Sequence, residues 1–132
     1  WLILIFFPNS NLSKYFVTSI FPILLLSGAY IFVLYKSYLS SYNFIDNFNL
    51  YLGFEELSDL FSNKSFLITF WIHFIAINLF IGGWIVKDSQ RLLISKILVI
   101  LPLIFTYLIG PLGLLLYWLI RIFYAKNINL YD

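Results

Sequence analysis

The sequence predicts an all-α fold: an integral membrane helical bundle of about four transmembrane helices, the first truncated, with a short amphipathic interfacial helix. Two observations lead to this class. Of the 132 residues, 62% are hydrophobic and 11% charged, with a mean hydropathy of +0.94, whereas an average soluble domain is about 25% charged. So small a domain has too little interior to hide that much apolar surface. In addition, three stretches reach the ~20 apolar residues needed to cross a bilayer.

The first half of the chain carries one partial and one complete span. Residues 1–7 are apolar and end in the turn sequence Pro8-Asn9-Ser10-Asn11, so we expect the remainder of a truncated first span there. Residues 16–35 contain few polar groups and form the expected second span. Residues 36–65 are too polar to cross. Their second half has the pattern of an amphipathic interfacial helix, with leucines set against the acidic residues Glu55, Glu56 and Asp59.

We interpret this amphipathic helix as a lid over the bundle or a docking surface for a neighbour. The third span is expected at 66–86, after N-cap candidates in Ser62-Asn63-Lys64-Ser65. The fourth is expected at 97–120, where the flanking Lys96 and Arg121 have side chains long enough to snorkel to the interface. We expect the whole chain, 1–132, to form a single transmembrane domain.

Several classes of function are excluded by what the sequence lacks. The chain has no cysteine, which excludes disulfide frameworks, zinc knuckles, iron–sulfur sites and thiol nucleophiles. The formal charge of +2 and the lack of a basic run give no sign of nucleic-acid binding. The sequence has no glycine-rich phosphate loop, HExxH motif or paired intramembrane carboxylates. We therefore expect no metal cluster and no nucleotide cofactor, and we expect the partners to be the lipid bilayer and other membrane subunits.

Polar groups within a span are the natural candidates for function, because burying each of them in the hydrocarbon of the membrane is energetically unfavourable. His73 is the only histidine and lies in the middle of the third span. Helical spacing places it on one stripe with Thr69, Ala76, Phe80 and Trp84. A neutral imidazole there can hydrogen-bond to a neighbouring helix, ligate a metal such as the magnesium of a chlorophyll, or act in acid–base catalysis. The interhelical bond is the favoured reading, and the other two stay open.

Other polar residues of the third span have local explanations. Asn78 and Gly82 mark a second face, on which an amide can bridge two helices and a glycine lets backbones approach. Asp88 and Arg91 follow at the membrane edge, where an i, i+3 ion pair accounts for them.

The fourth span contains the sequence Gly110-Pro111-Leu112-Gly113 near its centre. Pro111 frees the carbonyl of Tyr107, which predicts a bend. The two glycines form a notch that suits close helix packing or the flat tail of a polyene. No catalytic residue is assigned, and His73 is a possible ligand of a chlorophyll magnesium. The candidate ligand-binding residues are His73, Asn78, Thr69, Trp84, Gly110, Gly113 and Tyr107.

The chain resembles a known family through a series of short strings. In chain order these are Phe6-Phe7-Pro8, Leu60-Phe61, Trp71-Ile72-His73-Phe74-Ile75-Ala76, Leu79-Phe80-Ile81-Gly82, Asp88, Pro102, Gly110-Pro111-Leu112-Gly113-Leu114-Leu115-Leu116-Tyr117 and Arg121. They resemble the ABA4-like family, small four-span membrane proteins named after the plant abscisic-acid-deficient-4 protein of plastids, which is associated with neoxanthin formation. The resemblance extends from Trp1 to about Arg121. The family usually has an aspartate where this chain has Asn78, and often an arginine where it has Gly83.

The resemblance implies a membrane protein that works with pigments. Because both members of the charge pair are missing, it implies a non-catalytic subunit, associated with carotenoid or chlorophyll, of a photosynthetic or related membrane complex. One alternative is a xanthophyll-converting, neoxanthin-synthase-like enzyme or its partner, and another is a ligand-free scaffold subunit. The implied cofactors are carotenoid, chlorophyll or both. The implied location is a thylakoid or other plastid membrane, or a bacterial inner membrane.

Overall fold

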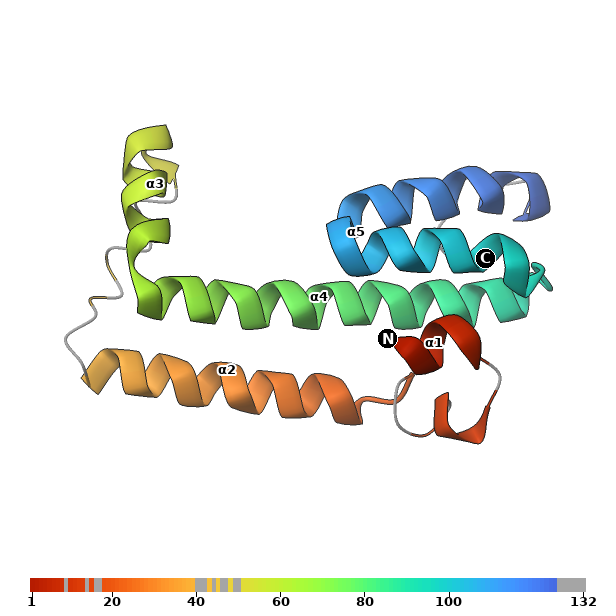
Figure 1. The fold of residues 1–132 in the computed structure, drawn as a ribbon, viewed down its shortest axis with the longest axis horizontal. Helices are drawn as coiled ribbons and strands as arrows, with labels where there is room; N and C mark the ends of the chain where they lie inside the picture. Colours follow the sequence, from red (N-terminus) through yellow and green to blue (C-terminus); the bar gives the residue numbers. More distant parts are fainter. Residues whose placement is uncertain are drawn as a thin grey trace. The chain divides into compact units, whose positions relative to one another are not determined.

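The computed structural model describes residues 1–8, 10–13, 15, 18–39, 43, 45, 48 and 51–125. Over these residues the fold is all-α, as predicted. It has five helices, which are α1 (Leu2–Phe6), α2 (Phe21–Leu39), α3 (Phe54–Ser62), α4 (Lys64–Arg91) and α5 (Lys96–Ala125) (Figure 1). By length and composition, α4 and α5 are the two described helices suited to crossing a membrane. The prediction of four spans is not confirmed. Helix α1 has only five residues, and the apolar part of α2, Phe21–Ser37, is shorter than a membrane-crossing helix needs to be.

The chain divides into two compact units. The terminal unit comprises Trp1–Ile23 and Ile77–Asp132, and the central unit comprises Leu24–Ala76. The expectation of one domain over 1–132 stays a prediction.

The second apolar stretch forms a helix whose limits differ from those expected. α2 runs from Phe21 to Leu39 instead of 16–35, and Phe16 and Val17 lie outside the described residues. The Ser19 hydroxyl accepts the N–H of Phe21 at 3.2 Å, which satisfies one of the free donors at a helix start. Pro22 follows in the first turn, where its missing N–H has no cost. At the other end Lys36 stays helical, in the last turn, where a cation complements the helix dipole.

The predicted interfacial helix and third span are joined by a cap. The side-chain oxygen of Asn63 accepts the N–H groups of Ser65 at 2.9 Å and Phe66 at 3.2 Å, so one of the four N-cap candidates acts as a cap. The ring of Phe61 in α3 lies 5.3 Å from that of Phe66 and 4.8 Å from that of Phe70. These contacts pack the end of α3 against the start of α4.

The predicted fourth span is not one bent helix but two half-helices that fold back on each other. The backbone leaves the helical region at Ile109, with φ −142° and ψ 66°, and the chain then returns along the first half of α5 (Figure 1). A Cβ built on Gly113 would lie 2.5 Å from the carbonyl oxygen of Pro102, although a straight helix would separate these residues by about 16 Å. The span at 97–120 stays a prediction, and the structure adds that the chain reverses at Ile109, just before Pro111.

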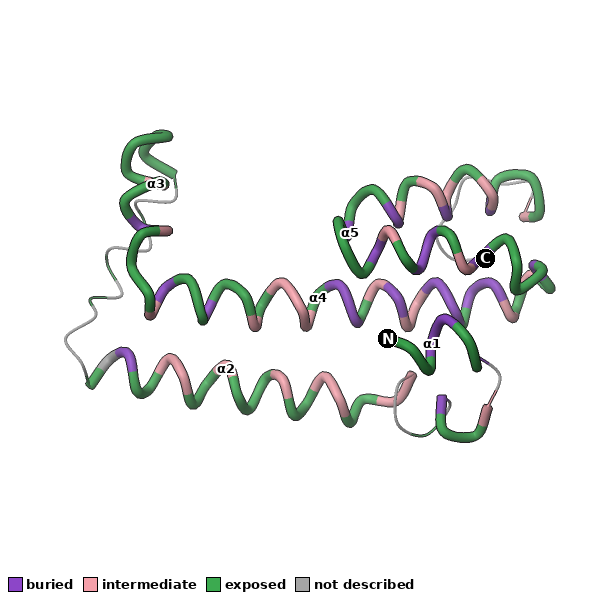
Figure 2. The backbone as a smooth tube through the Cα atoms, viewed as in Figure 1, coloured by how far each residue is buried: buried purple, intermediate pink, exposed green. Residues whose placement is uncertain are grey.

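Burial in the terminal unit follows from this reversal. Buried residues gather in the C-terminal half of α4 (Figure 2). α1 packs against α5, and the ring of Trp1 lies against Gly82, where a Cβ would overlap it. The resulting core consists largely of side chains that are almost fully buried, which are Leu4, Ile85, Val86, Leu103 and Tyr117.

Candidate functional site

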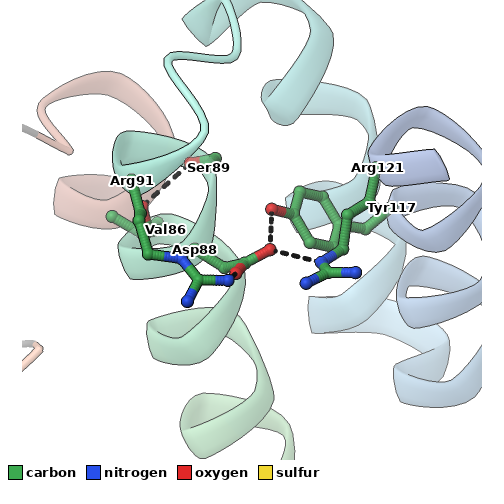
Figure 3. A network of polar contacts seen from close by, with 6 residues as sticks. All are labelled: Val86, Asp88, Ser89, Arg91, Tyr117 and Arg121. Atoms are coloured by element: carbon green, nitrogen blue, oxygen red, sulfur yellow. Dashed lines mark hydrogen bonds and ion pairs between the residues drawn. The ribbon is translucent and has the colours of Figure 1, made fainter. Parts of the chain in front are cut away.

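Four side chains near the C-terminal end of α4 form one polar network, which we name the Asp88 cluster: Asp88, Arg91, Tyr117 and Arg121 (Figure 3). One carboxylate oxygen of Asp88 accepts hydrogen bonds from the Tyr117 hydroxyl at 2.7 Å and from Nε of Arg121 at 2.8 Å. The other oxygen accepts Nη2 of Arg91 at 3.0 Å. Charge-assisted bonds of this kind are the strong ones. The network therefore joins α4 to the second half of α5.

The reversal of α5 is what assembles the Asp88 cluster. Tyr117 and Arg121 are four residues apart, so they project from one face of the second half-helix. In a straight α5, Tyr117 would be about 31 Å from Lys96, and the reversal brings it back to Asp88. The ring of Trp84 then packs edge-on against that of Tyr117, with the ring centroids 5.6 Å apart.

The members of this cluster differ in burial, and therefore in how much they can affect the stability of the fold. The side chains of Asp88 and Arg121 are 5% and 1% exposed, whereas that of Arg91 is 46% exposed. The predicted i, i+3 pair of Asp88 with Arg91 is confirmed. The expectation that Arg121 snorkels to the interface is wrong, because its side chain is buried and its Nε donates to the carboxylate of Asp88. The i, i+4 spacing of Tyr117 and Arg121, together with Asp88 as the only acidic residue within Lys64–Arg91, was the available signal.

A second polar feature lies where α5 reverses. Asn78 is buried in α4, and a Cβ on Gly110 would overlap its side-chain oxygen. Its amide nitrogen has no hydrogen-bond partner among the described residues. Nearby, the hydroxyl of Thr106 donates to the carbonyl of Pro102 at 2.8 Å, and a Cβ on Gly113 would overlap Thr106. The two glycines of the predicted notch are therefore filled, one by Asn78 and the other by the first half of α5.

We expect replacement of Asn78 by leucine to raise the free energy of unfolding by about 1 kcal/mol. A buried amide without a partner has a desolvation cost of about 1–3 kcal/mol, which an apolar side chain of similar shape removes. The measurement is equilibrium unfolding in detergent micelles, followed by circular dichroism. Thr69→Val is the matched control, since it also removes a buried polar atom of α4 but one that is already bonded. A clear loss of stability in Asn78→Leu would show that the amide has a partner in the membrane.

His73 and Thr69 belong to the central unit. The hydroxyl of Thr69 donates to the carbonyl of Ser65, one turn earlier, at 2.9 Å. His73 is exposed, and the centroid of its ring lies 6.3 Å from that of Tyr30. No hydrogen bond or ion pair joins His73 to another described residue. The predicted stripe does not share one environment, since Thr69 is buried and both His73 and Phe80 are exposed.

The seven candidate residues are distributed over several places instead of one pocket. Asn78 meets Gly110, Trp84 contacts the Asp88 cluster through Tyr117, and Tyr107 lies exposed with its ring 5.4 Å from that of Trp1. In the part of the chain that the structure describes, no group of three or more His, Cys, Asp or Glu side chains is placed to hold a metal ion.

Comparisons with known proteins give one result for the sequence. The family model ABA4-like, described as ABA DEFICIENT 4-like, matches residues 1–117. The matched region includes Asp88 and Tyr117, and Arg121 lies just beyond it. No curated protein matches the chain, and no solved structure does.

Proposed function

This chain belongs to the ABA4-like family, and on that premise we propose that it is a multi-pass integral membrane protein that holds a pigment, carotenoid or chlorophyll. In this proposal it is a non-catalytic subunit of a photosynthetic or related complex in a thylakoid, other plastid or bacterial inner membrane. The length and apolar composition of α4 and α5 support the location. The observation that carries the pigment proposal is the exposed imidazole of His73.

The surroundings of His73 favour a partner from outside this chain. An imidazole that faces hydrocarbon without a hydrogen bond is unfavourable, and no described residue bonds to this one. Large apolar side chains on neighbouring turns of α4 are exposed as well, among them Phe70, Trp71 and Ile77. Aromatic faces of this kind suit a flat conjugated molecule.

The chemistry of His73 fits a pigment better than a bare metal ion. One imidazole nitrogen can complete the coordination of a magnesium that already lies in a tetrapyrrole ring, whereas a bare ion needs several protein ligands. For an oxygenated carotenoid, the imidazole N–H can donate a hydrogen bond to the end ring. The pigment would supply light absorption, and His73 would hold and orient it.

Conversion of a xanthophyll by this chain is less well supported than binding. A rearrangement of an epoxide moves protons and requires a general acid within hydrogen-bond reach. The carboxylate of Asp88 lies fifteen residues farther along α4, about 22 Å of helix from His73. It is already held by Arg91, Tyr117 and Arg121.

The experiment is gentle purification of the protein with its native partners, followed by an absorption spectrum and pigment extraction. We expect pigment to copurify with the native chain and at least a fivefold lower pigment content in His73→Leu. His73→Trp keeps an N–H donor but has no nitrogen lone pair for magnesium, so it should retain carotenoid and lose chlorophyll. Leu67→Ala, exposed on the same helix, is the matched control and should keep the native pigment content.

Two results would contradict the proposal. A colourless native complex would leave His73 to an interhelical bond in a scaffold without ligand. Unchanged pigment content in His73→Leu would remove the imidazole from pigment binding. Deletion of the gene tests the enzymatic alternative separately, because an altered xanthophyll composition would support it and an unchanged one would eliminate it.

A further inference from the structure

A groove of about 510 Å³ lies in the terminal unit, where α4 turns into α5. Three segments line it: Ile5 and Pro8 at the end of α1, the turn from Ser89 to Lys96, and the first half of α5. Sites for small molecules commonly measure about 300–1,000 Å³. None of the residues that line the groove belongs to the Asp88 cluster.

The lining of the groove is divided into an apolar floor and a polar rim. Val99 and Leu103 are 4% and 1% exposed, and Ile5 and Ile94 are also buried. The polar residues of the lining are Ser89 and Gln90 at the end of α4 and Ser95 and Lys96 where α5 begins, and the exposed pair, Ser95 and Lys96, forms the rim. This division fits an amphiphile whose apolar chain enters the groove while its polar group stays at the rim.

The charged residues near the rim indicate which charge the polar group of the amphiphile should carry. Lys87, Arg91 and Lys96 lie within ten residues, and Asp88 is the only acidic residue among them. Asp88 is held by three donors of its own cluster, and no described carboxylate pairs with Lys96. An anionic group at the rim therefore meets an ammonium that is available to it.

The turn itself caps the end of α4, because the N–H of Ile94 donates to the carbonyl of Ser89 at 2.9 Å across a left-handed residue. Leu93 has φ +55°, a left-handed conformation that branched side chains rarely adopt. Its side chain is 88% exposed and lines the groove beside the polar rim. The left-handed residue belongs to the helix cap, and its exposed side chain adds apolar surface at the groove.

We propose that this groove binds one anionic membrane lipid, with an acyl chain along Val99 and Leu103 and the headgroup at Lys96. The site is independent of pigment binding at His73. Since basic side chains near a membrane attract anionic lipids, the groove would select lipids by headgroup charge.

The test is native mass spectrometry of the full chain in detergent, with dioleoylphosphatidylglycerol as the probe. Dioleoylphosphatidylcholine controls for the headgroup, and glycerol 3-phosphate represents the headgroup without its chains. Lys96→Gln removes the rim charge, and Ser95→Trp fills the mouth of the groove from an exposed position. Lys64→Gln, an exposed lysine of the central unit, is the matched control.

We expect the native chain to retain one phosphatidylglycerol more strongly than phosphatidylcholine. Lys96→Gln should weaken phosphatidylglycerol binding about fivefold, the effect of one basic residue, while Lys64→Gln should not. Ser95→Trp should abolish adducts of both lipids. Equal retention of the two lipids by the native chain, or native affinity in Lys96→Gln, would overturn the proposal. Displacement of the lipid by glycerol 3-phosphate would overturn the role of the acyl chain. If Ser95→Trp does not fold, the phosphatidylglycerol affinity of Lys96→Gln alone decides whether the proposal holds.

Discussion

Replacement of Arg121 by methionine should lower the free energy of unfolding by about 3 kcal/mol or more. The guanidinium is 1% exposed and donates to the buried carboxylate of Asp88 at 2.8 Å. Removal of one partner leaves a buried charge without its main compensation, which typically costs about 3–5 kcal/mol. The measurement is equilibrium unfolding in micelles, driven by increasing dodecyl sulfate and followed by circular dichroism.

Two further variants separate the buried pair from the surface pair. Arg91→Gln is the matched control, because its side chain is 46% exposed and exposed pairs contribute about 1 kcal/mol or less. The triple variant Asp88→Leu, Tyr117→Phe and Arg121→Met removes the three buried polar side chains of the Asp88 cluster together. It should be more stable than Arg121→Met alone, because no buried charge is left without a partner. If Arg121→Met and Arg91→Gln lose equal stability, the buried pair has no special weight.

Replacement of Gly113 by alanine should open the α5 hairpin. A Cβ there would overlap the backbone nitrogen of Thr106 and lie 2.5 Å from the carbonyl oxygen of Pro102. Backbone atoms cannot rotate away, so we expect a loss of about 3 kcal/mol. Because the chain has no cysteine, Leu98→Cys and Leu119→Cys can be spin-labelled cleanly. In the hairpin these labels should be close, as in packed helices about 8–10 Å apart, whereas a straight helix separates them by about 31 Å.

Two glycine variants serve as controls for this experiment. In Gly110→Ala the nearest atoms to the new Cβ are those of the Asn78 side chain, which can move, so its cost should be smaller and should fall further in combination with Asn78→Ala. Gly28→Ala in α2 meets nothing within 4 Å and should stabilise the helix by about 0.5–1 kcal/mol. A label separation near 31 Å in the native chain would contradict the hairpin directly.

Local features of the sequence predicted most of the secondary structure. Asn63 lies among the N-cap candidates, and its side chain caps α4. The acidic and apolar pattern placed a short helix near α3, which covers Phe54–Ser62. Each of these features depends on neighbours within a few residues, and so periodicity and capping rules suffice to find them.

The features that depend on distant residues were missed or misread. Pro111 gave a signal for a break in α5, but a proline does not specify the angle at which the chain continues. The reversal at Ile109 changes the partner of Arg121 from the membrane interface to Asp88. It also fills the predicted notch at Gly110 and Gly113, which the sequence left open to a polyene.

The sequence by itself therefore determined the all-α class, the approximate limits of α3 and α4 and the resemblance to the ABA4-like family, since composition and short-range pattern are sufficient for these. The tertiary structure decided that α5 turns back on itself, that Asp88 binds Tyr117 and Arg121, and that His73 is exposed on α4. The physical reason is that burial and ion pairing depend on which segments pack together, and the long-range contacts that choose among packings are not encoded in any one stretch of the chain.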